Sequence, residues 1–287
     1  MPPKTLKIAS LACSFNRKEK TSAFLKSLLS QTLPDGYSLD VYLLDDNSSD
    51  GTADQVRALF PTVKVIEGTG SLYWAGGMRT VWNAALQNSD YDFFLLLNDD
   101  VHLGDNAIAQ LLAAHKQSKF PQNILLGTVY DDNKKGISYG GHKLKSKVTG
   151  YVDTVVPDEK ELLEAHVGNA NVMMVDKGCV DKIGILSDEY IHGLADFDYT
   201  LTAIKNGVKV WVAPGYYGYC INDHGKNWLP ASAPLKKRIA YLYSPTGLAY
   251  KEYLHYTWKH YPLMLPGVFT KAWLKTLFPV VYDKFKK

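Results

Sequence analysis

The stretch Phe93-Phe94-Leu95-Leu96-Leu97-Asn98-Asp99-Asp100 decides the fold class, because a short apolar run leads directly into polar residues. Such a run of Phe and Leu is typical of a strand buried on both faces of a parallel sheet, although a buried helix segment has a similar composition. Open α/β sheets place their ligands at the carboxyl ends of the strands, which is where Asp99 and Asp100 would stand. Two interpretations of these carboxylates are open: a site for Mg²⁺ or Mn²⁺ that holds a diphosphate, or an Asx turn that caps a following helix.

The first half of the chain alternates strand and helix patterns. This predicts an α/β fold with a mostly parallel, doubly wound central sheet and helices on both faces. Strands are expected at residues 8–13, 39–44, 63–66, 93–97 and 124–129, and helices near 24–29, 53–60, 78–86 and 103–114. Beyond residue 130, we expect loops or hairpins over 131–147, strands at 172–175 and 208–212, and a helix at 199–205.

The composition is that of an ordinary globular protein, with 46% hydrophobic and 21% charged residues in a chain of 287. The cysteines Cys13, Cys179 and Cys220 are odd in number and lack metal-ligand spacing, so reduced thiols and a cytoplasmic location are expected. The sequence starts without an apolar secretory segment, and it has no apolar run long enough to predict a transmembrane helix.

Charge is unevenly distributed along the chain, although the net charge is only +3. Residues 236–287 contain ten Lys and Arg against two Asp and Glu, which leaves the rest of the chain acidic. A basic segment on an acidic body indicates an anionic surface as the partner of that segment. Nucleic acid is not expected as a partner, because the acidic body would repel it.

Polar residues follow four of the predicted strands, and strand ends of this kind converge on one edge of the sheet. The four segments are Cys13 to Arg17, Asp45 to Thr52, Gly68 to Gly70, and Asn98 to Asp100. We therefore expect a binding cleft at this edge. At the second strand end, Asp45 or Asp46 suits the imide N–H of a pyrimidine or the hydroxyls of a ribose, but the spacing alone favours a turn with a helix N-cap.

Further chemistry-bearing residues lie on either side of these strand ends. Gly70 and Gly76 would let the backbone approach a nucleotide closely, and Arg79 would face a phosphate. In Ala195-Asp196-Phe197-Asp198, one carboxylate is expected to cap a helix and the other to act as a general base. His224 lies in a loop among aromatic residues, where it is either a metal ligand or a solvated histidine.

Taken in order, these residues resemble glycosyltransferase family 2, a family of inverting, nucleotide-sugar-dependent enzymes with the A-type glycosyltransferase fold. The matching segments are Ala12 to Arg17, Asp45 to Thr52, Gly70 to Gly77, Asn98 to Asp100, Ala195 to Asp198, and His224. The resemblance implies a catalytic domain over residues 1–234. Its nucleotide-sugar-binding half would be about 1–130 and its acceptor and catalytic half 131–234.

The resemblance also implies roles for individual residues. Asp45 and Asp46 match the aspartates that hold the base and ribose, and Asn98-Asp99-Asp100 matches the D-x-D motif with Asn98 in place of the first aspartate. Asp100 is then the expected metal ligand, and Asp99 a ribose or metal contact. The full set of expected donor contacts is Cys13, Phe15, Arg17, Asp45, Asp46, Gly70, Gly76, Arg79, Asn98 and Asp99.

On the acceptor side, Asp196 matches the second position of the family's Glu-Asp pair, which is the general base, while Ala195 replaces the Glu. His224 matches a metal ligand of some members. Asn169, Asn171 and Trp228 are the expected acceptor contacts. For Asn169 and Asn171, a polar turn before the next strand explains the sequence equally well.

The implied activity is inverting transfer of a hexosyl or deoxyhexosyl group from a UDP- or dTDP-type sugar, with Mn²⁺ or Mg²⁺ as a Lewis acid. The acceptor would be a glycan or lipid-linked hydroxyl in surface polysaccharide biosynthesis, and residues 70–79 look similar to those of rhamnosyltransferases. A nucleotidyltransferase is an alternative, but residues 13–18 lack the Gly-rich phosphate loop it needs. A non-catalytic sugar-nucleotide or glycan-binding module is another, against which Asp99, Asp100 and Asp196 argue.

Residues 235–287 are expected to form a helical, basic and aromatic extension. In a helix over 268–277, Phe269, Trp273 and Leu277 would share one face, with Lys271 and Lys275 roughly opposite. Residues 266–287 would then lie in the inner face of a membrane as an interfacial helix, attracted by anionic lipids. Packing on the catalytic domain or a homo-oligomer interface uses the same apolar face equally well.

Overall fold

The computed structural model describes residues 5–131, 136–220 and 228–285. A central sheet has the strand order β10-β13-β6-β12-β4-β1-β2-β3, with β5 and β7 paired to β13 and β6. Its strands are β1 Leu6–Ser14, β2 Tyr37–Asp45, β3 Lys64–Glu67, β4 Phe93–Leu97, β5 His102–Leu103, β6 Asn123–Tyr130, β7 Ile137–Tyr139, β10 Leu163–Glu164, β12 Val172–Asp176 and β13 Lys209–Tyr219. The predicted strands are therefore present, and β13 continues well beyond its predicted end.

The first half of the sheet is parallel, as the alternating pattern predicts. β1 pairs in parallel with both β2 and β4, and β2 pairs in parallel with β3. The carboxyl ends of these strands therefore lie at one edge. In the second half, β13 is parallel to β6, but β12 runs antiparallel to both of its neighbours, β4 and β6. The fold is thus α/β with a mixed, mostly parallel sheet.

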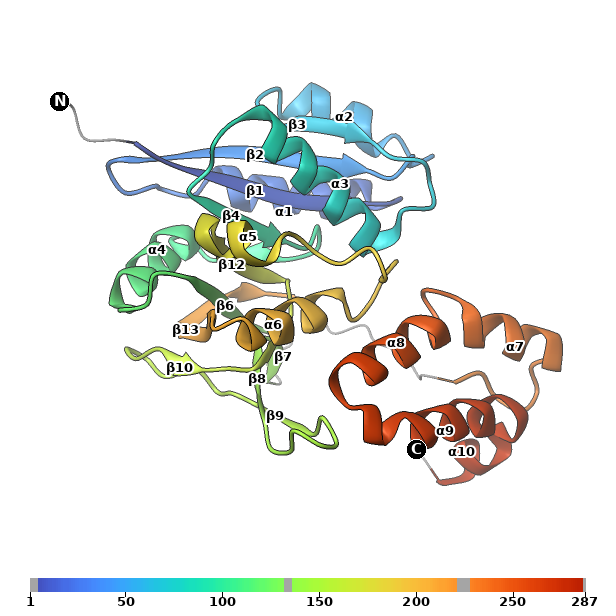
Figure 1. Ribbon diagram of the computed structural model, residues 1–287. Helices are drawn as coiled ribbons and strands as arrows, with labels where there is room; N and C mark the ends of the chain where they lie inside the picture. Colours follow the sequence, from blue (N-terminus) through green and yellow to red (C-terminus); the bar gives the residue numbers. More distant parts are fainter. Residues whose placement is uncertain (1–4, 132–135, 221–227, 286–287) are drawn as a thin grey trace.

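Helices cover both faces of this sheet (Figure 1). One face is covered by α3 Tyr73–Asn88, α5 Lys177–Ile183 and α6 Ala195–Lys205, and the other by α1 Lys18–Leu29, α2 Thr52–Leu59 and α4 Ala107–Gln117. The strand β4 explains this arrangement, because Phe94 and Leu96 pack into one apolar core while Phe93, Leu95 and Leu97 pack into the other. A strand that is apolar at every position needs a cover on both sides.

A smaller sheet follows in the segment where hairpins are expected. It has the order β11-β8-β9, with β8 Gly141–Leu144, β9 Val152–Thr154 and β11 Val167–Gly168. The turn before β12 brings Asn169 and Asn171 to the carboxyl end of β4, where Asn171 accepts the backbone N–H of Asn98.

The C-terminal segment gathers in a helical unit beside α6 (Figure 1). Its elements are α7 Leu235–Tyr243, α8 Tyr250–His260, a 3₁₀ turn at Pro262–Met264, α9 Leu265–Leu277 and α10 Pro279–Phe285. In the described residues, no helix is both long and apolar enough to span a membrane.

The expected division of α9 into an apolar and a lysine face is wrong in part. The Trp273 indole donates to the Tyr250 hydroxyl at 3.1 Å, so this ring packs against α8, and Lys275 is buried. Phe269 and Leu277 are exposed. Spacing alone did not reveal that α8 would cover the Trp273 side of the helix.

Candidate active site

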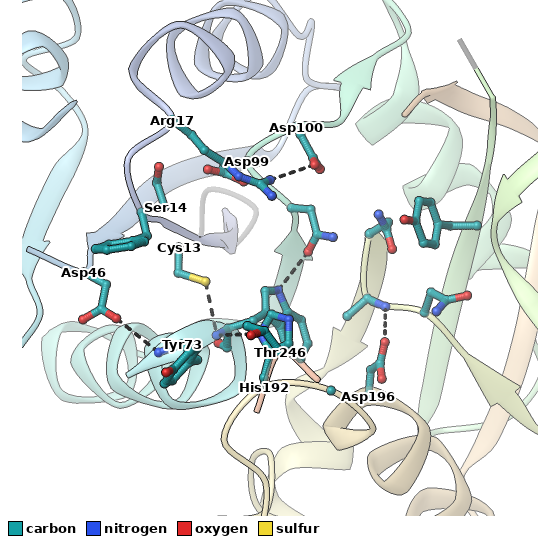
Figure 2. Close-up of a pocket in the computed structure, with 18 of the residues that line it drawn as sticks. Cys13, Ser14, Arg17, Asp46, Tyr73, Asp99, Asp100, His192, Asp196 and Thr246 are labelled. Carbon is teal, nitrogen blue, oxygen red and sulfur yellow. Dashed lines mark hydrogen bonds and ion pairs between the residues drawn. The ribbon is translucent and has the colours of Figure 1, made fainter. Parts of the chain in front are cut away.

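A cavity of about 830 Å³ opens at the carboxyl ends of β1, β2 and β4 (Figure 2). Most of the predicted site residues line it: Cys13, Phe15, Arg17, Asp46, Gly70, Asn98, Asp99, Asp100, Asn169, Asn171 and Asp196. The expectation that polar strand ends converge is therefore correct. Ser14, Tyr73, Trp74, Tyr139, His192 and Thr246 also line the cavity.

Arg17 bridges the two carboxylates that follow β4. Its Nη1 lies 3.2 Å from Oδ1 of Asp99 and 2.8 Å from Oδ2 of Asp100. Burial raises the pKa of Asp99 to about 6, although the Arg17 guanidinium opposes this shift. Two carboxylates that converge on one cation form a local centre of negative charge on the cavity wall.

The same oxygens are of the kind that a divalent cation binds. Paired carboxylates are ligands that Mg²⁺ and Mn²⁺ accept, with water and phosphate oxygens completing the shell. In the part of the chain that the structure describes, no group of three or more His, Cys, Asp or Glu side chains is arranged around a metal position. Asp99 and Asp100 therefore fit the ion as a partial set. The predicted ligand His224 lies outside the described residues.

Asn98 is bound to an aromatic side chain. Its Oδ1 accepts the indole N–H of Trp74 at 2.9 Å. Burial raises the pKa of the Cys13 thiol, which is therefore neutral and donates to the Trp74 carbonyl at 3.6 Å. Asn98 thus fixes a ring of the cavity wall, a task that needs a hydrogen-bond acceptor but no charge.

Asp46 holds the loop that leads into α3. Its carboxylate accepts the backbone N–H groups of Gly70, Leu72 and Tyr73 at 2.7, 2.8 and 3.1 Å. It stands at the N-terminus of α3, where unpaired N–H groups and the helix dipole favour a negative charge. Gly70 has φ +85°, a conformation that favours glycine. Asp45 accepts from the backbone and hydroxyl of Ser48, as the turn interpretation requires, and it does not line the cavity.

Two predicted donor contacts lie behind the cavity wall. Arg79 donates from Nη1 to the carbonyls of Ser187 and Tyr190 at 2.8 and 2.7 Å, so it holds a loop and does not face the cavity. The N–H of Gly76 donates to the carbonyl of Ile191. The phosphate contact predicted for Arg79 is therefore not supported, because its guanidinium is hydrogen-bonded to these two backbone carbonyls.

Asp196 is the carboxylate that the second half of the chain contributes to the cavity (Figure 2). It lies in the first turn of α6, where its Oδ1 accepts the N–H of Phe197 at 2.8 Å and its Oδ2 accepts the N–H of Ala170 at 3.2 Å. Burial raises its pKa to about 6, and the two backbone hydrogen bonds oppose the shift. A carboxylate with such a pKa is ionised at neutral pH and still basic enough to take a proton.

The predicted acceptor residues divide into two groups. Asn169 and Asn171 line the cavity, and the Asn171 amide lies 3.9 Å from the Cys220 sulfur. Trp228 does not reach the cavity, because its indole donates to Asp283 at 2.9 Å and its ring packs near Tyr282. It belongs to the C-terminal helical unit.

Sequence comparison identifies the family. The profile of glycosyl transferase family 2 matches residues 11–171, more than half of the chain. The chain belongs to glycosyl transferase family 2. No curated protein matches the sequence significantly. The family segment includes Asp46, Asp99 and Asp100 and ends before Asp196.

Solved structures show the same fold as this family 2 chain. TarS from S. aureus has a TM-score of 0.55 and 18% identity, over 75% of this chain and 37% of TarS. The mannosyltransferase PcManGT from Pyrobaculum calidifontis, in complex with GDP-Man and Mn²⁺, has a TM-score of 0.54 and 17% identity, over 93% of this chain and 69% of that chain. A TarS fragment, residues 1–349, in complex with UDP-GlcNAc has a TM-score of 0.53 and 18% identity, over 77% of this chain and 60% of the fragment. The chain thus spans less than two thirds of the TarS chains, and at these identities the likeness is one of fold.

The cavity residues of this family 2 chain that were not predicted as site residues include Tyr139, His192 and Thr246. Tyr139 lies on β7, His192 in the loop before α6, and Thr246 between α7 and α8. His192 lies shortly before the acidic motif Ala195-Asp196-Phe197-Asp198 in the sequence. Its position in Ile191-His192-Gly193 was therefore a usable signal. Tyr139 and Thr246 carry no local signal, because distant segments bring them to the cavity.

Proposed function

We propose that this chain is an inverting glycosyltransferase that moves a sugar from a nucleoside-diphosphate sugar to a hydroxyl group. One observation carries the proposal: Asp196, a carboxylate with a pKa of about 6, lines the same cavity as the Asp99–Asp100 pair. A base and a centre for phosphate-bound cations in one cavity are the two parts that such a transfer needs. Membership of glycosyl transferase family 2 supports the same assignment.

Asp196 acts as the general base in this proposal. It takes the proton of the acceptor hydroxyl while the hydroxyl oxygen attacks the anomeric carbon. The bond from that carbon to the diphosphate oxygen breaks on the opposite face, so a single displacement inverts the anomeric configuration. One base is sufficient, and no covalent glycosyl-enzyme forms, in contrast to retaining hydrolases with two carboxylates.

Asp99 and Asp100 would hold Mn²⁺ or Mg²⁺ together with the donor diphosphate, and His224 remains a proposed further ligand. When bound, the ion neutralises charge that develops on the leaving diphosphate. Mn²⁺ and GDP-Man in the mannosyltransferase complex support this choice. Arg17 then turns from the carboxylates towards the diphosphate, for which a guanidinium is a suitable donor.

The donor would occupy the part of the cavity formed by residues 1–130, and the acceptor the part formed by residues 131–234. Phe15 is 51% exposed at the end of β1 and offers a stacking surface for the nucleobase. UDP and UDP-GlcNAc bound to TarS support a nucleoside-diphosphate sugar as donor. We assign the UDP or dTDP class and a hexosyl or deoxyhexosyl group, with rhamnosyl among the candidates.

The acceptor would be a glycan or lipid-linked hydroxyl in surface polysaccharide assembly at the inner face of a membrane. Exposed apolar side chains of the C-terminal unit support the membrane contact, with Leu263 77%, Phe278 58% and Val280 61% exposed. The excess of Lys and Arg over Asp and Glu in segment 236–287 would add attraction to anionic lipids. A homo-oligomer interface is the competing use of this surface.

A donor screen tests the proposal. The protein is titrated with UDP-, dTDP- and GDP-sugars in Mn²⁺, and thermal stabilisation and release of the nucleoside diphosphate are measured. We expect stabilisation by one nucleotide class and slow, Asp196-dependent hydrolysis of its sugar. If no nucleotide sugar stabilises the protein or is hydrolysed, the proposed function is wrong.

A further inference from the structure

Residues 187–198 form the segment that carries Asp196 and the cavity residues His192, Gly193 and Leu194. Leu194, directly before α6, has φ +66°, a left-handed conformation that is unfavourable for a leucine. Such a residue keeps this conformation only where surrounding contacts fix it. The contacts of this segment therefore determine how well the proposed base is positioned.

On its inner side, this segment is held by α3. Arg79 donates to the carbonyls of Ser187 and Tyr190, and the N–H groups of Ala75 and Gly76 donate to the carbonyl of Ile191. These bonds leave the outer side of the segment, including the N–H of Ile191, to other partners.

On its outer side, the segment is held by α8 of the C-terminal unit. The buried Glu252 accepts the N–H of Ile191 at 3.0 Å. Asp198, 2% exposed, accepts the Tyr190 hydroxyl at 2.9 Å and lies 2.7 Å from Nε2 of His260 and 2.8 Å from Nζ of Lys259. A buried carboxylate needs such partners, because its desolvation is otherwise costly.

The tautomer of His260 follows from its two neighbours. Lys205, in the last turn of α6, lies with Nζ 3.1 Å from Nδ1 of His260 and donates to the Lys259 carbonyl at 3.0 Å. An ammonium group can only donate, so Nδ1 accepts and Nε2 carries the proton that is donated to Asp198. His260 thus contacts Asp198 in the first turn of α6 and Lys205 in its last turn. These two residues, at positions i and i+7, lie on the same face of the helix.

We infer that α8 is a positioning element of the active site, which fixes Asp196 through the contacts of Glu252, Lys259 and His260 with residues 187–198. The inference rests on the proposed function for the role of Asp196. None of these α8 side chains lines the cavity, so their effect on the reaction passes through the segment they hold.

Hydrogen–deuterium exchange of the full chain without ligand gives the first test. His260→Ala should raise exchange in residues 187–198 about tenfold or more, because a lost anchor lowers the free energy of local opening. His260→Gln should stay close to the unsubstituted protein, since its amide donates to Asp198 and accepts from Lys205. Exchange in β1 and β2 should be unchanged in both variants.

Kinetics with the nucleotide sugar found in the donor screen give the second test. His260→Ala and Lys259→Met should lower kcat about tenfold to a hundredfold, as expected for a misplaced base, with the donor KM within about twofold. Lys251→Met, on the exposed side of the same helix, is the matched control and should leave both constants unchanged.

Several results would overturn the inference. They are unchanged exchange over 187–198 in His260→Ala, an unchanged kcat, a donor KM that rises as much as kcat falls, or a His260→Gln variant as impaired as His260→Ala. If the unsubstituted protein hydrolyses no nucleotide sugar, the proposed function fails, and the exchange experiment decides the anchoring alone.

Discussion

Asp196 and Asp198 are two positions apart in the first turn of α6, yet Asp196 lines the cavity and Asp198 lies 2.7 Å from His260 of the C-terminal unit. Positions i and i+2 of an α-helix are separated by about 200° around the helix axis, so two carboxylates at this spacing face opposite sides of the helix. One acidic motif therefore supplies a carboxylate to the cavity wall and a carboxylate that contacts the C-terminal unit. From the sequence, one of these carboxylates was expected to act as a general base and the other to cap the helix, and the contact of Asp198 with His260 was not predicted.

Asp196→Asn should keep nucleotide binding and lose sugar transfer by about a hundredfold or more, because general-base catalysis contributes about that factor. Titration calorimetry with the nucleoside diphosphate and a discontinuous transfer assay measure the two effects. Asp181→Asn, at an exposed position of α5, is the control. Undiminished turnover in Asp196→Asn would remove this residue from the role of base.

The pH dependence of kcat should have an acidic limb near pH 6. Asp196 must be ionised to accept a proton, and burial raises its pKa to about 6, so the rate rises through this pH and levels off above about 7. The assay uses saturating Mn²⁺ and donor, because a bound cation keeps the Asp99 carboxylate ionised. Titration of Asp99 then does not contribute to the pH dependence of kcat. A kcat that stays constant from pH 5 to 8 would contradict the assignment.

The same pKa predicts an effect on stability. The native state holds the Asp196 proton more tightly than the unfolded chain, whose aspartates have a pKa near 3.9. The ionised carboxylate therefore lowers the stability of the native state as the pH rises from about 4 to 6. The melting temperature of Asp196→Asn should move upward relative to the unsubstituted protein over this interval. A constant difference between pH 4 and 7 would show that burial does not perturb this group.

Asp46→Asn should destabilise the protein by about 1–3 kcal/mol, because an amide cannot accept all three backbone N–H groups of the Gly70 loop. Chemical denaturation measures the change. Asp54→Asn, with a 90% exposed side chain in the same half of the chain, should have no effect. Equal stability of the two variants would contradict the loop-holding role of Asp46.

Asp100→Ala should abolish Mn²⁺-dependent donor binding, since it removes half of the carboxylate pair. Without nucleotide, Arg17→Gln should instead raise the affinity for Mn²⁺ several-fold, because Arg17 and the ion compete for the same oxygens. Mn²⁺ electron paramagnetic resonance measures both effects directly. Donor binding by Asp100→Ala that still depends on the metal would place the ion elsewhere.

The C-terminal unit should bind anionic vesicles through its exposed apolar residues. Phe278→Ser combined with Val281→Ser should weaken binding to phosphatidylglycerol vesicles at least about tenfold, by the loss of apolar transfer energy. Leu59→Ser, at a 56% exposed position of α2, is the matched control. Sedimentation with neutral phosphatidylcholine vesicles isolates the electrostatic part. Equal binding of all variants would leave the oligomer interface as the use of this surface.

The first half of the fold was predictable because its signals are local. Each strand there ends in polar residues, and parallel pairing brings these ends to one edge without further information. The contacts of Asp45 and Arg79 were not predictable from the sequence. Asp45 binds Ser48 in a turn and Arg79 binds backbone carbonyls of a loop, although both side chains would also suit a nucleotide. The cavity position of Thr246 and the contacts of Glu252, Lys259 and His260 could not be predicted from the sequence, because they depend on how a distant helical unit packs on α6.

The central strand β12 lies between β4 and β6, although both of these are made earlier on the ribosome. Until residues 172–176 emerge, the edges of β4 and β6 that β12 later covers have no partner, and such apolar strand edges are templates for association with other chains. During this interval of its synthesis, the chain is therefore exposed to aggregation and would benefit from chaperone binding. A fragment cut at residue 171, where the family segment ends, stays permanently in that interval.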